Sequence, residues 1–266
     1  MSVLLLGGTG TTGRPLSRLL PEARVASRQP GPGRVRFDWA DPATFRPALA
    51  GVRAVYLVPP PADLEPMRLA APFFEEATAA GVRRVVLLGA LSAFDAAPGV
   101  DELFRAVREM PESAVLRPSG FMQNLLGEHP LAAGLRERGE LVGATGDGKV
   151  GWIDAEDIAA VAARLLTGPA PAGEHLLTGP GALSYGEVAE LITGLTGRPV
   201  RHRPVSVAEQ AAMFGATGLP PAFAGRLAEI YGAIADGAED LVTGAVEEIT
   251  GRPPRSLREF VRAHLA

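Results

Sequence analysis

The stretch Gly7-Gly8-Thr9-Gly10-Thr11-Thr12-Gly13 decides the fold of this chain. It separates the apolar run Val3–Leu6, which predicts a buried strand, from a helical pattern over Thr12–Leu20. Its glycines satisfy both G-x-G-x-x-G and G-x-x-G-x-x-G, spacings that let the backbone turn sharply and approach a pyrophosphate. The helix that follows directs N–H groups and its positive dipole end at that anion. An ordinary glycine-rich turn is the alternative, but the strand before and the helix after favour a phosphate-binding loop.

A second position, about 20 residues further on, distinguishes the two nicotinamide dinucleotides. An NAD site normally has Asp or Glu at the end of the second strand, whereas this predicted strand, Arg24–Ala26, is followed by Ser27-Arg28. A guanidinium can pair with the 2′-phosphate of NADP, and the Ser27 hydroxyl can donate to it. We therefore expect NADP(H), with a surface arginine as the alternative. Asp38 and Trp39 are candidates for the adenine edge, although Asp38 is equally suited to a turn.

Outward from the loop, short apolar runs alternate with helical patterns as far as residue 128. Apolar strands separated by helices are typical of a parallel sheet covered on both faces. We predict an α/β fold, a Rossmann-type doubly wound parallel sheet over residues 1–128, with a smaller mixed α/β substrate lobe over 129–266 that is interleaved with the sheet. The predicted strands are Val3–Leu6, Arg24–Ala26, Val35–Phe37, Ala54–Val58, Arg84–Leu88 and Ala114–Leu116, and the helices Thr12–Leu20, Pro42–Leu49 capped by Asp41, Pro66–Ala80 and Asp101–Met110.

The second half of the chain is richer in helical patterns. Ser184 with Glu187 three residues on forms a capping box at the start of one of them. The predicted strands here are Trp152–Ile153, Glu174–Leu177 and Pro199–Arg203, and the helices are Asp154–Leu166, Ser184–Leu195, Ser206–Phe214, Pro221–Asp236 and Ser256–His264.

Composition excludes several classes of chemistry and partner. The 266 residues include no cysteine and four scattered histidines, so we expect no disulfide, no thiolate nucleophile and no metal site. A net charge of −4 with 6% aromatic residues argues against nucleic acid. The longest apolar run at the N-terminus is far too short for a signal or a membrane span. We expect a cytoplasmic protein with a small-molecule substrate, and the sequence leaves its oligomeric state open.

The proton relay of short-chain dehydrogenases is missing. That relay places Tyr four residues before Lys, but the only lysine is Lys149, residue 145 is Thr, and the predicted helix Asp101–Met110 has no tyrosine. Ser92, after a strand, is the catalytic candidate, with a cap or turn residue as the alternative. Further candidates lie where strands end, since open α/β sheets bind ligands at that edge. The cofactor-binding candidates are Gly7, Thr9, Gly10, Thr11, Thr12, Gly13, Ser27, Arg28, Asp38, Trp39, Val58, Pro59, Gly89, Ala90 and Pro118, and the substrate-binding candidates are Pro60, Leu91, Phe121, Met122, Asn124 and His129. Core packing is the alternative for the apolar members, and a solvated loop for His129 before Pro130.

Motifs along nearly the whole chain resemble the NmrA-like atypical short-chain dehydrogenase/reductases. Besides the glycine loop and Ser27-Arg28, they are Val115-Leu116-Arg117-Pro118 with Phe121-Met122-Gln123-Asn124, Ile153-Asp154-Ala155-Glu156-Asp157-Ile158-Ala159, Leu177-Thr178-Gly179-Pro180 with Leu183-Ser184-Tyr185, and Glu247–Pro254 with Ser256-Leu257-Arg258-Glu259-Phe260. The second half is most similar to the branch of the ergot-alkaloid reductases, the agroclavine and festuclavine dehydrogenase-like proteins.

The resemblance implies a Rossmann fold, NADP binding and a substrate lobe from the C-terminal half. Many members carry a lysine before the predicted helix Asp101–Met110, where this chain has Pro98, so that role does not carry over. The ergot-type branch implies reduction of iminium-type substrates, which are already electrophilic and need orientation more than an acid. We therefore expect an NADPH-dependent reductase in secondary metabolism, acting on an imine, iminium or carbonyl substrate. A non-catalytic NADP(H) sensor and a redox-neutral enzyme on the same scaffold are the alternatives.

Overall fold

The computed structural model describes residues 2–29, 31–91, 98–169 and 173–266, except for the side chain of Pro98. The chain divides into two compact units. Unit 1 comprises Met1–Ala90, Asp95–Arg117 and Ala155–Leu176, and unit 2 comprises Leu91–Phe94, Pro118–Asp154 and Leu177–Ala266.

Unit 1 is built on a seven-stranded sheet, as far as the described residues show. Its strands are β1 (Val3–Leu5), β2 (Arg24–Ser27), β3 (Arg34–Arg36), β4 (Ala54–Leu57), β5 (Arg84–Leu88), β6 (Glu112–Pro118) and β9 (Gly173–Leu177). They lie in the order β3-β2-β1-β4-β5-β6-β9, and every neighbouring pair from β3 to β6 is parallel. The chain moves outward from β1 to β3 and then returns to place β4 on the other side of β1. The glycine loop therefore follows the strand at which the order reverses, which is where doubly wound sheets bind ligands.

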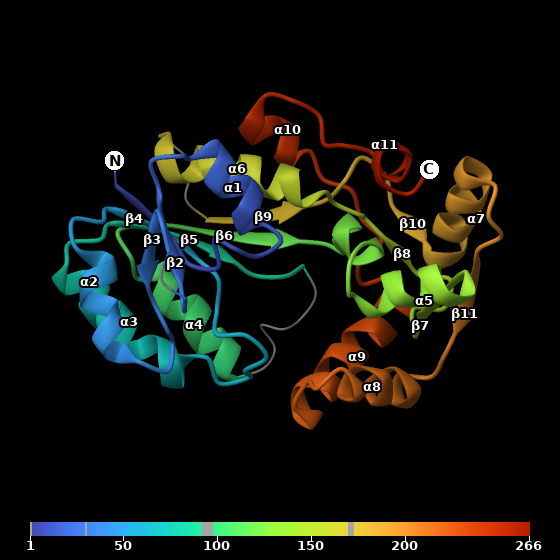
Figure 1. The fold of residues 1–266 in the computed structure, drawn as a ribbon, viewed down its shortest axis with the longest axis horizontal. Helices are drawn as coiled ribbons and strands as arrows, with labels where there is room; N and C mark the ends of the chain where they lie inside the picture. The colour runs from blue at the N-terminus through green and yellow to red at the C-terminus, as the bar shows by residue number, and fades with distance from the viewer. Residues whose placement is uncertain (1, 30, 92–97, 170–172) are drawn as a thin grey trace. The chain divides into compact units, whose positions relative to one another are not determined.

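Helices cover both faces of this sheet. Figure 1 shows α1 and α6 on one face and α2, α3 and α4 on the other. Their bounds are α1 Gly13–Leu19, α2 Phe45–Leu49 after the 3-10 turn η1 Pro42–Thr44, α3 Met67–Ala79, α4 Pro98–Arg108 and α6 Ala155–Thr167. Burial on both faces explains why the central strands do not alternate: all residues of β1 and β4 are buried. The predicted doubly wound sheet is confirmed.

Unit 2 contains two small sheets and most of the later helices. β8 (Lys149–Val150) pairs antiparallel with β10 (Leu183–Ser184), and β7 (Glu140–Gly143) pairs parallel with β11 (Arg201–Pro204). Its helical segments are η3 Met122–Leu125, α5 Pro130–Arg138, α7 Tyr185–Thr196, α8 Val207–Ala216, α9 Pro221–Ala235, α10 Ala245–Thr250 and α11 Leu257–His264. The core of this unit gathers Met122, Trp152, Tyr185, Phe214 and Phe260.

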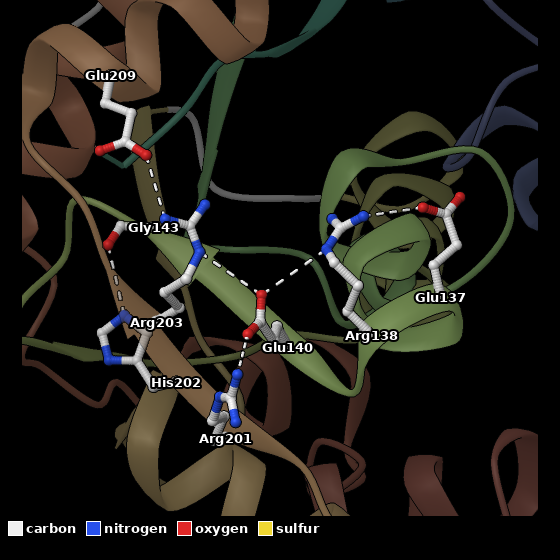
Figure 2. Close-up of polar contacts among 8 residues, drawn as sticks. All are labelled: Glu137, Arg138, Glu140, Gly143, Arg201, His202, Arg203 and Glu209. Atoms are coloured by element: carbon white, nitrogen blue, oxygen red, sulfur yellow. Dashed lines mark hydrogen bonds and ion pairs between the residues drawn. The ribbon is translucent and has the colours of Figure 1, made fainter.

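A buried carboxylate joins the β7–β11 pair. The side chain of Glu140 is 8% exposed and lies 2.6 Å from Arg201, 3.5 Å from Arg203 and 3.7 Å from Arg138 (Figure 2). Because a buried charge is costly unless it is paired, Arg201 and Arg203 on β11 hold that strand against β7, and Arg138 at the end of α5 adds a third positive charge. His202, between two of them, points the other way, toward the carbonyl of Gly143.

Several element predictions need correction. Trp152–Ile153 is not a strand: Ile153 makes only an isolated bridge with Phe121. Asp41 does not cap the helix after it with its side chain, because that carboxylate pairs with Arg36 at 3.0 Å. The sequence patterns also missed α5, α10 and three short strands, whose bounds are given above.

The compact units also differ from a division at residue 128. Residues 118–154 belong to unit 2, beginning with Pro118, the last residue of β6. The segment Ala155–Leu176 then returns to unit 1. The return has a simple cause, because the apolar side of α6, which includes Ile158, Val161 and Leu165, packs on α1, β4 and β5. None of the described helices is both long enough and apolar enough to cross a lipid bilayer.

Candidate functional site

The glycine loop has a geometry that side chains would prevent. Gly7 has φ +71°, and a Cβ there would lie 2.8 Å from the side chain of Val58. A Cβ on Gly13 would lie 2.2 Å from the carbonyl oxygen of Gly7, so the start of α1 sits directly against the end of β1. The Gly10 amide donates to the same oxygen at 2.8 Å. Gly7, Thr9, Gly10 and Thr11 remain exposed, so the loop presents bare backbone to a ligand.

Thr12 is the polar exception in this loop, because it is buried. Its Oγ1 accepts a hydrogen bond of 2.9 Å from the hydroxyl of Tyr56, which lies on β4 and is fully buried. Burial raises the pKa of Tyr56 well above its ordinary value, and the bond to Thr12 offsets this only in part. Thr12 therefore fixes the loop to the sheet and does not cap α1 with its side chain. Sequence reasoning missed Tyr56, although it is one of only three tyrosines and stands on a predicted strand.

Arg28 stands directly after β2, as predicted. It is exposed, and within the described parts of the chain its side chain makes no hydrogen bond or ion pair. Ser27 is half-buried, and its Oγ accepts from the amide of Gln29 at 3.2 Å. Opposite Ser27 on β3 is Arg36, whose guanidinium is paired with Asp41. Of these two arginines at the end of β2 and β3, it is therefore Arg28 whose guanidinium is available for an anion.

Asp38 lies in a turn, which was the alternative to a contact with the adenine edge. Its Oδ1 accepts from the amide of Ala40 at 3.0 Å, the pattern of an Asx turn. Trp39 is half-buried, with its ring centroid 5.0 Å from that of Phe37 and 5.3 Å from that of Phe73. Whether either residue contacts an adenine stays a prediction.

The remaining cofactor candidates lie at the carboxyl ends of β4, β5 and β6. Val58 and Pro59 follow β4 and are half-buried, and Val58 contacts the glycine loop at Gly7. Gly89 and Ala90 follow β5. The Gly89 amide donates to the Leu116 carbonyl at 2.8 Å, and a Cβ on Gly89 would lie 2.9 Å from the Phe104 ring. Pro118, the last residue of β6, is buried and belongs to unit 2.

The substrate candidates separate by burial. Pro60 is buried in unit 1, and Met122 is fully buried in the core of unit 2, where it packs with Trp152 and Tyr185. Leu91, Phe121 and Asn124 of unit 2 are half-buried, so they retain surface for a ligand. Ser92, the catalytic candidate, lies outside the described residues.

His129 is not a solvated loop residue. It is the N-cap of α5, and its Nδ1 accepts from the amide of Leu131 at 3.2 Å. Burial lowers the pKa of His129 to about 4, and a hydrogen bond to the backbone of Asn124 opposes this shift only in part. At neutral pH the ring is therefore uncharged and ties the start of α5 to the end of η3.

Asp154, at the start of the predicted helix Asp154–Leu166, lies just before α6. Its side chain is fully buried, Oδ1 accepts from Gln123 Nε2 at 2.6 Å, and Oδ2 accepts from Arg255 Nη1 at 3.0 Å. The motif that contains Asp154 was visible in the sequence, but its partners stand 31 and 101 residues away. No local spacing could have connected them.

A groove of about 570 Å³ also lies in unit 2, where α7 and α11 begin. It contains none of the residues predicted for cofactor or substrate. Its lining residues are Pro180, Gly181, Leu183, Glu187, Glu190, Leu191, Ser256, Leu257 and Arg258.

A glycine-rich turn after the strand at which the order of a doubly wound parallel sheet reverses defines a Rossmann-type protein. No protein-family model matches the chain. It is 42% identical to an uncharacterized oxidoreductase, YesF, of Bacillus subtilis, over 99% of this chain and 95% of the relative. It is 37% identical to an agroclavine dehydrogenase of Claviceps fusiformis, over 98% and 96%. The structure of an NADPH-dependent quinone oxidoreductase from Escherichia coli, complexed with NADPH, superimposes with a TM-score of 0.82 at 22% identity, covering 100% of this chain and 99% of the other.

The chain therefore belongs to the NmrA-like atypical short-chain dehydrogenase/reductases, in the branch of the agroclavine and festuclavine dehydrogenases. This is a family of oxidoreductases.

Proposed function

We propose that the protein is an NADPH-dependent reductase of a small apolar secondary metabolite with an imine, iminium or carbonyl group. The observation that carries the proposal is an exposed glycine loop at the switch point of the sheet, with Arg28 at the end of the next strand. The relatives support it as well, since one is named an agroclavine dehydrogenase and a protein of similar fold binds NADPH.

The residues present fit a dinucleotide. The close approach of Gly13 to the Gly7 carbonyl leaves no room for a side chain, which is what a backbone cradle for a pyrophosphate requires. In this proposal the amides of Gly7–Gly13 hold the pyrophosphate, and Arg28 and Ser27 hold the 2′-phosphate. Val58, Pro59, Gly89, Ala90 and Pro118 would line the remainder, with Asp38 and Trp39 at the adenine.

When bound, NADPH supplies the hydride. An iminium carbon that accepts a hydride becomes a neutral amine without a proton, whereas an imine nitrogen or a carbonyl oxygen must also take a proton, here from water. Half-buried Phe121 and Asn124 would orient the substrate, with Leu91 and Pro60 as further contacts. Ser92 remains a predicted hydrogen-bond donor to the substrate.

The positions of tyrosine and lysine support a mechanism without a Tyr–Lys pair. Lys149 Nζ lies 3.2 Å from Glu187, so its charge already has a partner. Tyr56 donates to Thr12, and burial raises the pKa of Tyr185 well above its ordinary value and that of Tyr231 to about 12. All three phenols are buried and belong to the packing of the two units.

The test follows NADPH oxidation at the nicotinamide absorbance with three probes: menadione, an N-alkyl dihydroisoquinolinium salt and an aromatic aldehyde. We expect oxidation with at least one of the first two and a weaker reaction with NADH. Tight NADPH binding without turnover of any probe would contradict the reductase and favour the sensor. Product formation without net loss of NADPH would favour redox-neutral chemistry.

A further inference from the structure

The 3-10 turn η3 has three sides with different surroundings. In a 3-10 helix, residues three apart lie one above the other. Met122 and Leu125 are three apart and are 0% and 1% exposed, so they form the side that faces the core of unit 2. Asn124 is half-buried, as is Phe121, the N-cap residue of η3, whose carbonyl accepts from the Asn124 amide at 3.0 Å. Gln123, between these two pairs, directs its amide to Asp154.

Asp154 bonds to η3 from the segment around Ile153, which pairs with the backbone before and at the start of this turn. Gly120 and Met122 bond to the backbone of Ile153, with N···O distances of 3.0 Å and 2.8 Å. The next residue, Asp154, adds its hydrogen bond of 2.6 Å from Gln123. Backbone pairing sets where η3 begins, and the side-chain bond sets its rotation about its own axis.

The other oxygen of Asp154 reaches the C-terminal part of the chain. Arg255 donates to it and also lies over the ring of Phe260, 5.6 Å from its centroid. Phe260 is fully buried on α11, whose start is closed by the capping box of Ser256 and Glu259. A fully buried carboxylate is costly unless its oxygens are bonded, so Gln123 and Arg255 both stabilise Asp154.

We infer that Asp154 is a positioning residue for the substrate, acting through Gln123. It fixes the rotation of η3 and thereby the direction of Phe121 and Asn124, with α11 bracing it through Arg255. This inference rests on the proposed function, in which those two side chains contact the substrate. It extends that function by assigning a role to the Ile153–Ala159 motif.

Gln123→Met is the first test, because Gln123 is half-buried and its loss leaves Asp154 bonded to Arg255. We expect kcat/KM for the better of menadione and the dihydroisoquinolinium salt to fall roughly tenfold or more, since small misplacements of substrate contacts cost that much. KM for NADPH should change less than about twofold. Asp154→Asn should give the same split with an equal or larger loss of kcat/KM, because it also removes the charge that pairs with Arg255. The double variant should lose little beyond Asp154→Asn, because the bond between residues 123 and 154 can be lost only once.

Glu137→Gln is the matched control. It also removes a polar side-chain contact from unit 2, but one in an exposed ion pair, with Arg138 at 2.9 Å. It should leave both kinetic constants unchanged. An unchanged kcat/KM in Gln123→Met, with the wild type active, overturns the inference.

A second readout separates this inference from the proposed function. If the wild type reduces no probe, the proposed function fails. Hydrogen exchange of the amides of residues 119–125 then tests Asp154 alone. These amides should exchange faster in Gln123→Met than in Glu137→Gln, and equal exchange overturns the positioning role even if Asp154→Asn does not fold.

Discussion

At the scale of single residues, we propose that Arg28 selects the cofactor, because its guanidinium follows β2 without a partner among the described residues. We predict that Arg28→Asp shifts the preference from NADPH toward NADH. The variant loses a charge-assisted contact worth roughly 1.5–3 kcal/mol, so KM for NADPH should rise roughly 10- to 100-fold. The new carboxylate can accept from the 2′-hydroxyl of NADH, and KM for NADH should fall. Steady-state kinetics with each cofactor measure both changes.

Arg198→Asp is the control for this charge reversal. Arg198 is also exposed but lies in unit 2, after α7, away from the glycine loop in sequence. It should leave the NADPH preference as in the wild type. An Arg28→Asp protein with unchanged KM for NADPH would remove Arg28 from the site.

At the scale of elements, the junction of β1 with α1 depends on Gly13. We predict that Gly13→Ala lowers the free energy of unfolding by about 3 kcal/mol, because the new Cβ would lie 2.2 Å from the Gly7 oxygen, a backbone atom that cannot rotate away. To relieve this clash, the start of α1 must move away from Gly7, and this movement would open the proposed phosphate cradle. NADPH affinity should therefore fall roughly tenfold or more. Urea unfolding and a fluorescence titration with NADPH measure the two effects.

Gly194→Ala is the matched variant. Gly194 lies inside α7, and a Cβ there would meet nothing within 4 Å. Alanine in place of glycine in an exposed helix should stabilise the protein by about 1 kcal/mol and leave NADPH affinity unchanged. If Gly13→Ala binds NADPH like Gly194→Ala, the loop is not the phosphate site.

Elements were predictable where a few neighbouring residues determine them. The capping box of Ser184 and Glu187 is present as expected, because a cap and its third helical residue meet in any helix start. Trp152–Ile153 was wrong as a strand, since its apolar pattern reflects a core contact of Trp152 and not a ladder. The helix α5 was missed because His129-Pro130 resembles a loop, although proline at the first helical position and a capping His129 start a helix here.

For the whole molecule, His129 makes stability depend on pH. Its pKa is lowered to about 4 in the folded protein, against about 6.5 in an unfolded chain. Above pH 6.5 the ring is neutral in both states and contributes nothing. Below it the unfolded state takes up a proton that the folded state refuses, so stability falls as the pH drops from about 6.5 toward 4.

We predict that the wild type loses about 2 kcal/mol more than His129→Asn between pH 7 and pH 5. Asparagine keeps a side-chain acceptor for the N-cap of α5 and does not titrate. Urea unfolding at the two pH values measures the difference. The burial-lowered pKa of His202 acts in both proteins and cancels in the comparison. Equal losses in both proteins would show that His129 is not held neutral.

The sequence was sufficient for the glycine loop, the strand that precedes it, the position of Arg28 after β2 and the capping box of Ser184 with Glu187. These features depend on the conformational range of glycine and on hydrogen bonds between residues up to four apart, which hold in any context. Packing of the whole chain decided the return of α6 to the sheet of unit 1 and the bond between Tyr56 and Thr12. It also decided the partners of Asp154, because a buried charge is satisfied by whichever donors the fold brings to it, and those donors came from Gln123 and Arg255.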